Sequence, residues 1–241
     1  MLKRLVIFLA ILAGLAALAD RGLAAAAGNA TANQIRVHEG LREDPDVTFK
    51  GFPFVTQAFR GEFREVDVTV RDYEKEGLTI ERIDAVLEGV EVDLGDAVNG
   101  RVSAVPISAG VATLTVTYGD LTAYLATKPG NIRVQSRDGR TVVVSSFGIP
   151  GVGQVDVEGT PTVKTGARSI RVTVSNVRPV AGDVTLTSAL AATAAARSSF
   201  TIPLDDLPFG IKLKSAVLTG TALEVTASAE GFTIDARSNL G

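Results

Sequence analysis

Hydrophobic and polar residues alternate along most of the chain after residue 46, which is the pattern of half-buried β-strands. Val66, Val68 and Val70 are one such set, and residues 78–94 form a near-continuous strand pattern with two changes of parity. That run would measure on the order of 55 Å if extended, well beyond a strand of ordinary length. Parity changes indicate β-bulges, and Gly89 falls at the second one. Because long bulged strands bend, the pattern predicts a strongly curved antiparallel sheet.

Residues 20–42 have helical periodicity instead. Their apolar positions recur at alternating steps of four and three, and the face that they form has one polar member. The members of this face are Leu23, Ala27, Ala30, Gln34, Val37 and Leu41. We expect this face to pack on the sheet and Asp44-Pro45 to end the helix. The single histidine, His38, lies beside the face, and no metal-ligating residues cluster with it in sequence.

Shorter elements are predicted from capping and turn signals. Asp120 is placed to cap a helix over residues 121–127, and Thr187 lies at the start of an alanine-rich helix over residues 188–198. The Arg-Asp-Gly-Arg sequence of residues 137–140 predicts a β-hairpin turn between two strands.

A faint internal repeat suggests duplication. Residues 47–53 (Val-Thr-Phe-Lys-Gly-Phe-Pro) are similar to residues 155–161 (Val-Asp-Val-Glu-Gly-Thr-Pro), whose Gly-Thr-Pro predicts a turn. We expect a single domain over residues 20–241, with duplicated halves at about 45–147 and 153–235.

The first residues are typical of an export signal. A basic Met-Leu-Lys-Arg start precedes residues 5–19, an unbroken apolar run that is short for a membrane-spanning helix of about 20 residues. Ala17-Leu-Ala19 fits the small-x-small cleavage pattern, and an uncleaved signal anchor is the alternative. In both cases the body lies on the periplasmic, extracytoplasmic face of the cytoplasmic membrane, anchored by residues 5–19 or released after cleavage near Ala19.

Composition narrows the class of protein. Val and Thr dominate after residue 46, which favours an α+β, mostly β fold. The formal net charge is −3 and no Arg/Lys stripe occurs, so a nucleic-acid partner is not expected. Without cysteine there is no disulfide, no thiolate nucleophile and no Cys-ligated metal.

A catalytic centre is not expected either. A nucleophile–histidine triad would depend on His38 alone, and no Gly-x-Ser-x-Gly motif occurs. The acidic residues of the predicted strands lie mostly at polar positions of the alternation, where a solvated sheet face accounts for them. We therefore predict no enzyme activity, no cofactor and no metal site.

Residues 49–61 (Phe-Lys-Gly-Phe-Pro-Phe-Val-Thr-Gln-Ala-Phe-Arg-Gly) are the most distinctive stretch. Four of the ten Phe of the chain lie within residues 49–59, in a segment punctuated by Gly and Pro. Their rings either fill an ordinary core corner or line an apolar cleft.

The chain resembles the DUF2993 family, the LmeA-like phospholipid-binding proteins of the actinobacterial envelope, in four segments. They are Gly51-Phe-Pro-Phe-Val-Thr-Gln-Ala-Phe-Arg-Gly, the strand ending Leu87-Glu-Gly-Val-Glu-Val, the Thr117-Tyr-Gly-Asp-Leu segment, and the closing Leu207-Pro-Phe-Gly-Ile-Lys-Leu-Lys-Ser-Ala-Val-Leu-Thr-Gly with Leu223-Glu-Val. The resemblance covers residues 24–234. It implies a TULIP-like lipid-binding fold, in which a long curved antiparallel sheet wraps around or packs on an N-terminal helix, and it supplies no catalytic residues.

The implied apolar groove needs aliphatic and aromatic walls, because each buried CH₂ of a lipid contributes about 0.8 kcal/mol. We expect the walls or the mouth to include Phe52, Phe54, Phe59, Leu87, Val90, Leu114, Val116, Leu121, Leu125, Phe209, Ile211 and Leu213. The candidates for pairing with a head-group phosphate are Arg60, Arg64, Lys212 and Lys214.

The resemblance thus predicts an exported envelope protein that binds a phospholipid, such as anionic phosphatidylinositol, and meets the membrane surface. Such a protein would support envelope lipid or lipoglycan (lipomannan-type) assembly. The alternative is a structural or scaffolding envelope module with a closed core and a protein partner.

Overall fold

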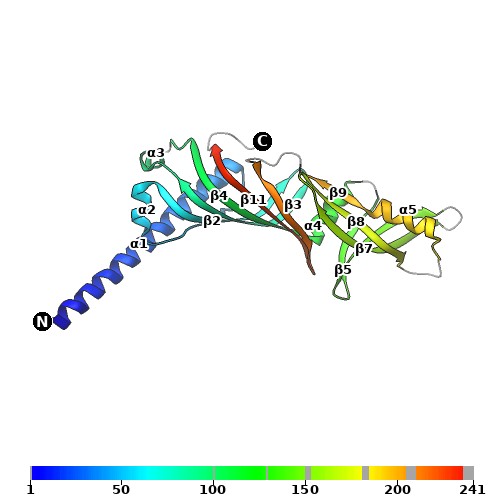
Figure 1. Cartoon of the computed structure of the whole chain (residues 1–241), viewed down its shortest axis with the longest axis horizontal. Helices are drawn as coiled ribbons and strands as arrows, with labels where there is room; N and C mark the ends of the chain where they lie inside the picture. The colour runs from blue at the N-terminus through cyan, green and yellow to red at the C-terminus, as the bar shows by residue number, and fades with distance from the viewer. Residues whose placement is uncertain are drawn as a thin grey trace. The chain divides into compact units, whose positions relative to one another are not determined.

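The structure, a computed structural model, is α+β and mostly β, with one long N-terminal helix and two antiparallel sheets (Figure 1). It describes residues 2–99, 101–128, 130–149, 153–180, 185–204 and 210–235. The first part of the chain forms α1 (Leu2–Glu39), β1 (Asp46–Phe49), α2 (Phe54–Arg60), β2 (Glu62–Lys75), β3 (Leu78–Glu91), α3 (Leu94–Val98), β4 (Ala104–Thr117) and α4 (Tyr118–Ala126). The remainder forms β5 (Arg133–Arg137), β6 (Arg140–Ile149), β7 (Gly153–Thr165), β8 (Ser169–Pro179), α5 (Ser188–Ser198), β9 (Phe200–Pro203), β10 (Lys212–Leu218) and β11 (Ala222–Asp235).

The strands form a six-stranded sheet with the order β1-β2-β3-β4-β11-β10 and a five-stranded sheet with the order β5-β6-β7-β8-β9. The residues group into two compact units. Unit 1 comprises Met1–Arg71, Asp84–Ala112 and Ala229–Gly241, and unit 2 comprises Asp72–Ile83 and Thr113–Ser228.

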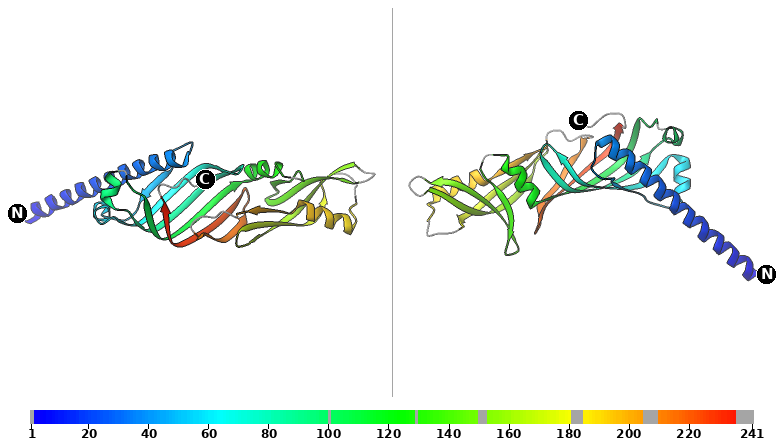
Figure 2. Two further views of the ribbon diagram at one scale, coloured as in Figure 1. Left: turned by 90° about the horizontal axis from the view of Figure 1, so that it is seen from above. Right: turned by 180° about the vertical axis from the view of Figure 1, so that it is seen from behind.

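The long curved sheet predicted from the alternating pattern is confirmed (Figure 2). Strands β2, β3, β4 and β11 each have 14 residues, beyond the usual 3–10. Gly89 has a φ of +60°, and both Leu87 and Val90, which differ in parity, belong to the same core cluster. The predicted irregularity at Gly89 therefore keeps apolar side chains on one face of β3.

Helix α1 is longer than predicted and packs through a different face. The predicted face is wrong, because Leu23 is 54% exposed and Val37 is 67% exposed. The buried positions are Asp20, Ala24, Gly28 and Ala32. A Cβ atom on Gly28 would lie 2.3 Å from the carbonyl oxygen of Val47 in β1. Small residues four apart thus set the packing face, since they allow α1 to approach β1 closely.

Helix α4 begins earlier than predicted, and its cap is Thr117 and not Asp120. The Thr117 hydroxyl oxygen accepts the backbone N–H of Asp120 at 3.1 Å, and the Asp120 carboxylate accepts the Thr117 hydroxyl at 2.5 Å. The Thr117 hydroxyl thus caps the helix, and the Asp120 carboxylate holds that hydroxyl in place, directly at the end of β4.

The turn predicted at residues 159–161 is wrong, because β7 continues through it. The register against β8 shifts between Glu158 and Thr160, which marks a bulge. Pro161 has no N–H to donate to a neighbouring strand. It is tolerated because β6 pairs with β7 only as far as Gly159, so no residue of β6 needs a hydrogen bond from Pro161.

The hairpin and the alanine-rich helix are confirmed. Arg137 pairs with Arg140, and the two central residues Asp138 and Gly139 have φ of 51° and 72°, as a type I′ turn requires. Helix α5 starts after Thr187, whose hydroxyl accepts the backbone N–H of Leu190 at 3.3 Å.

The core of unit 1 lies between α1 and the apolar face of the first sheet. Ala32 of α1 is buried together with strand residues Val47, Val66, Val90 and Ile107. Other apolar side chains of this cluster are only partly buried. They include Phe63, Leu87 and Phe232. The sheet therefore keeps accessible apolar surface within unit 1.

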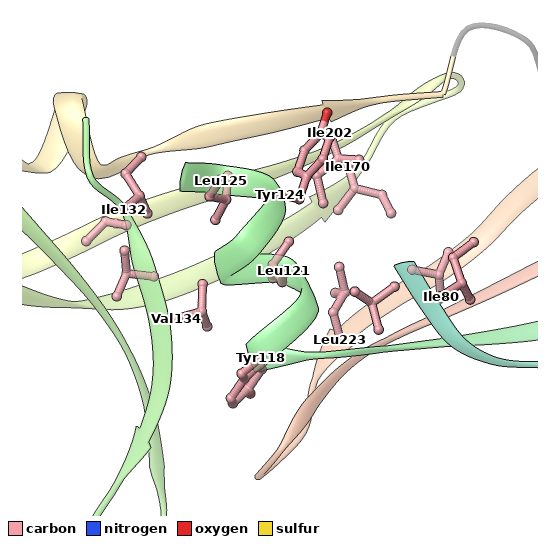
Figure 3. Packing of buried hydrophobic residues seen from close by; sticks show 14 residues of the cluster. Ile80, Tyr118, Leu121, Tyr124, Leu125, Ile132, Val134, Ile170, Ile202 and Leu223 are labelled. Carbon is pink, nitrogen blue, oxygen red and sulfur yellow. The ribbon is translucent and has the colours of Figure 1, made fainter. Parts of the chain in front are cut away.

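The core of unit 2 surrounds α4, as Figure 3 shows. Leu121 and Leu125 of α4 are 0% and 2% exposed and pack with residues of both sheets. These include Ile80 and Leu223 from the first sheet, and Val134, Ile170 and Ile202 from the second. A separate cluster places Ala194 of α5, with 0% exposure, against Phe147 and Val157.

Candidate functional site

The distinctive stretch of residues 49–61 forms a corner built around the seven-residue helix α2. Gly61 ends the helix in the left-handed region with a φ of +69°, and its N–H donates to the carbonyl oxygen of Ala58 at 3.1 Å. A Cβ atom at Gly61 would lie 2.4 Å from the carbonyl oxygen of Val92. Glycine is therefore required both by the turn and by the close approach of Val92, which directly follows β3.

The start of α2 is capped by a residue distant in sequence, Asp20 of α1. Its carboxylate accepts the backbone N–H groups of Phe54 at 2.9 Å and Val55 at 3.0 Å, and it pairs with Arg21 at 3.1 Å. Burial alone would raise the pKa of Asp20, but these N–H groups and the guanidinium of Arg21 hold that pKa below its ordinary value. Asp20 therefore joins α1 to the corner as a carboxylate.

Buried Gln57 ties α2 to the two strands beside it. Its amide group donates to the carbonyl oxygen of Lys50 at 3.0 Å, and its side-chain oxygen accepts the backbone N–H of Arg64 at 2.9 Å. The amide thus satisfies backbone groups at the end of β1 and the start of β2. The sequence interpretation did not assign Gln57 a role, because a polar residue in a short helix is ordinarily expected to face solvent.

Phe54 belongs to an aromatic cluster of this corner. It is 7% exposed, and its ring centroid lies 5.6 Å from that of Phe49 and 5.9 Å from that of Phe63. Phe49 and Phe63 are 4.8 Å apart. The ring of Phe54 therefore packs α2 on the sheet, so substituting it would test folding before it tested a ligand.

The other two predicted aromatic residues face outward. Phe52 is 59% exposed and Phe59 is 78% exposed. The guanidinium carbon of Arg21 lies 5.7 Å from the centroid of the Phe52 ring, within the range of a cation–π contact. Both rings are therefore available for contact with an apolar partner.

A depression of about 240 Å³ lies beside α2. It is lined by Phe52, Pro53, Thr56, Gln57, Arg60, Glu62, Phe63, Arg64, Gly89 and Glu91. It is smaller than the roughly 300–1,000 Å³ of pockets that enclose drug-sized ligands, so it has room for part of a phospholipid only. Three predicted site residues, Phe52, Arg60 and Arg64, come together here.

The polar lining of the depression has both signs of charge. Within the described part of the chain, neither Arg60 nor Arg64 forms an ion pair, so both guanidinium groups keep their donors available. Glu62 and Glu91 supply carboxylate acceptors at the same place. The site can therefore accept an anionic group and hydroxyl donors together.

The remaining predicted residues divide between the units. In unit 1, Leu87 is half-buried and Val90 is 6% exposed in the core. In unit 2, the side chains of Val116, Leu121 and Leu125 are at most 4% exposed, which leaves them no surface for a ligand. The other predicted residues of unit 2 are half-buried Leu114, Ile211 and Leu213, and exposed Lys212 and Lys214. Phe209 lies outside the described residues.

No group of three or more His, Asp or Glu that could hold a metal ion occurs among the residues that the structure describes. One helix, over Ala10–Glu39, is long and apolar enough to cross a membrane by length and composition; its position near the N-terminus also suits a signal sequence.

An N-terminal helix with two antiparallel sheets is consistent with the TULIP-like fold of lipid-binding proteins. Comparison with protein families then identifies the family. Residues 18–228 match the LmeA-like phospholipid-binding family, and the chain belongs to that family. The family is described by lipid binding and not by a catalytic activity. No curated protein and no solved structure matches the chain significantly.

Proposed function

We propose that this is an exported, non-enzymatic envelope protein that binds a phospholipid through unit 1 and supports envelope lipid or lipoglycan assembly. Membership of a phospholipid-binding family carries the proposal. The apolar N-terminal segment supports export and a position at the membrane, with the body on the extracytoplasmic side.

The head group is assigned to the depression beside α2. Its phosphate would pair with Arg60 and Arg64, whose donors have no carboxylate partner in the described structure. Glu62 and Glu91 would accept hydrogen bonds from head-group hydroxyls. An anionic, hydroxyl-rich head group such as that of phosphatidylinositol satisfies both halves of this lining.

The acyl chains are assigned to the partly buried apolar face of the first sheet in unit 1. Phe63 lines the depression and belongs to the core cluster that contains half-buried Leu87 and Phe232. Phe63 thus connects the charged lining to the accessible apolar surface. Each CH₂ removed from water there would contribute about 0.8 kcal/mol.

The experiment is native mass spectrometry and lipid extraction of the purified full chain. We expect phospholipid to co-purify in a stoichiometric amount, and we expect that amount to depend on Arg60 and Arg64. Arg60→Gln and Arg64→Gln should each weaken phospholipid binding about 10- to 100-fold, because each removes a charge-assisted hydrogen bond.

Arg71→Gln is the matched control, since Arg71 is exposed on the same strand as Arg64 and does not line the depression. It should bind lipid as the unaltered protein does. A stable, lipid-free monomer would overturn lipid binding and favour the scaffolding alternative, for which the closely packed core around Leu121 is the supporting observation.

A further inference from the structure

The apolar part of α1 has almost no cover from the rest of unit 1. Ile11, Leu12, Leu15 and Leu18 are between 53% and 71% exposed. Figures 1 and 2 both show the N-terminal part of the helix extending beyond the strands. A helix with this many uncovered aliphatic side chains requires an apolar surrounding. A bilayer provides it when the segment is retained as a signal anchor.

The length of this segment places its end near the membrane surface. Residues 5–19 span roughly 22 Å as a helix, less than the roughly 30 Å of a bilayer core. A short segment draws its flanking residues toward the headgroup region. The first flanking residues on the body side are Asp20 and Arg21.

Asp20 and Arg21 both form hydrogen bonds to the α2 corner. The carboxylate of Asp20 lies 2.9 Å from the amide nitrogen of Phe54, and the guanidinium of Arg21 donates to the carbonyl oxygen of Gly51. The start of α2 is therefore within hydrogen-bond distance of the end of the apolar segment. The α2 corner therefore lies at about the same depth in the bilayer interface as Asp20.

The corner presents two exposed rings, Phe52 and Phe59, together with Arg60. Aromatic rings beside cationic side chains are typical of segments that lie in the bilayer interface, where the ring enters the acyl boundary and the cation meets phosphate. We propose that the α2 corner docks on the phospholipid bilayer surface, with Phe52 and Phe59 inserted beside the end of α1. This inference rests on the proposed membrane location and not on retention of a carried lipid.

The chain contains no cysteine, so one introduced cysteine can carry a polarity-sensitive fluorophore without background. Thr56→Cys is the reporter, because Thr56 is exposed, lies one turn before Phe59 and leaves both rings in place. Because Thr56 also lines the depression, retention of phospholipid is measured on the chain without this substitution. Val37→Cys is the control. Val37 is 67% exposed on the same helix as Asp20 but roughly 25 Å farther along the axis, away from the apolar segment.

The full chain is reconstituted in phosphatidylcholine/phosphatidylglycerol vesicles that contain a lipid-attached quencher near the headgroups. We expect the fluorophore at position 56 to shift to the blue and to be quenched, and the fluorophore at position 37 to do neither. In the Phe52→Ser/Phe59→Ser background, the signal at position 56 should fall to the level of position 37. As a control, Val37→Ser in place of Phe52→Ser/Phe59→Ser should leave the signal at position 56 unaltered. Circular dichroism should be the same throughout, and the melting temperature should change little, because all three side chains are exposed and Phe52→Ser loses only the contact with Arg21.

Equal quenching at both positions, or none at either, overturns the docking proposal. A blue shift at position 56 without quenching also overturns it, because another protein surface or a second copy would then cover the rings. Phospholipid retained without quenching would leave the proposed function standing and refute docking alone. Quenching without co-purified phospholipid would support docking and refute the proposed binding of a phospholipid.

Discussion

At the residue scale, Asp20 shows how one side chain takes a role that its local sequence does not indicate. The pattern identified it as the polar residue that ends an apolar run next to a candidate cleavage site. In the structure its carboxylate caps α2, 34 residues later in the chain. That partner could not be predicted locally, because a cap is ordinarily supplied within the same turn.

Asp20→Asn should weaken the attachment of α1 to α2 in a pH-dependent way. The pKa of Asp20 is below its ordinary value of 3.8, so its stabilising contribution is fully present above that value and is lost as the pH falls through the lowered pKa. Urea unfolding of both proteins should show a gap in the midpoint at neutral pH. The gap should close below about pH 4. A gap that stays constant from pH 7 to pH 2 would contradict this role for the charge.

At the element scale, the packing face of α1 is the instructive case. Counting large apolar residues selected a face that includes Leu23 and Val37, both of which are exposed. The face that packs is defined by small residues, because the close approach of two backbones excludes large side chains. Gly28, opposite the carbonyl of Val47, is the residue that permits the contact.

Two glycines of α1 provide a matched test of this contact. Gly22→Ala should raise the free energy of unfolding by up to about 1 kcal/mol, since alanine favours helix and no atom lies within 4 Å of the new Cβ. Gly28→Ala has the same propensity gain but meets the Val47 carbonyl oxygen at 2.3 Å. It should be less stable than Gly22→Ala by about 1–3 kcal/mol. Urea titration followed by circular dichroism in detergent measures both, and equal effects would show that the contact is loose.

At the scale of the whole molecule, the core cluster around Leu121 and the proposed site belong to different units. The cluster around Leu121 lies in unit 2, whereas every residue of the α2 corner lies in unit 1. Several residues that the pattern marked as groove walls, Val116 and Leu125 among them, are fully packed in that core. An apolar strand or helix position has the same pattern whether protein or lipid covers it, so alternation alone could not distinguish them.

Leu121→Ala should therefore destabilise the fold by about 2–5 kcal/mol, because it leaves a cavity in a fully buried site. Below its melting temperature, the variant should still bind phospholipid and dock on vesicles. Val217→Ala, at a position that is 54% exposed in the same unit, should change stability by less than about 0.5 kcal/mol. Loss of lipid binding in folded Leu121→Ala would place the ligand in unit 2 instead.

Local patterns in the chain were enough to predict the mostly β class, the long bulged strands, the hairpin at Asp138-Gly139 and the lipid-binding family, because alternation, turn chemistry and motif residues act over a few positions. Long-range contacts settled the rest: the pairing of β4 with β11, the small-residue face of α1 and the capping of α2 by Asp20.

Long-range contacts also decided which of the four clustered phenylalanines is buried. Phe54 and Phe59 differ in exposure by 71 percentage points, from 7% to 78%, because only one of them meets the rings of Phe49 and Phe63. Those partners come from neighbouring strands, so the difference exists only once the sheet has formed.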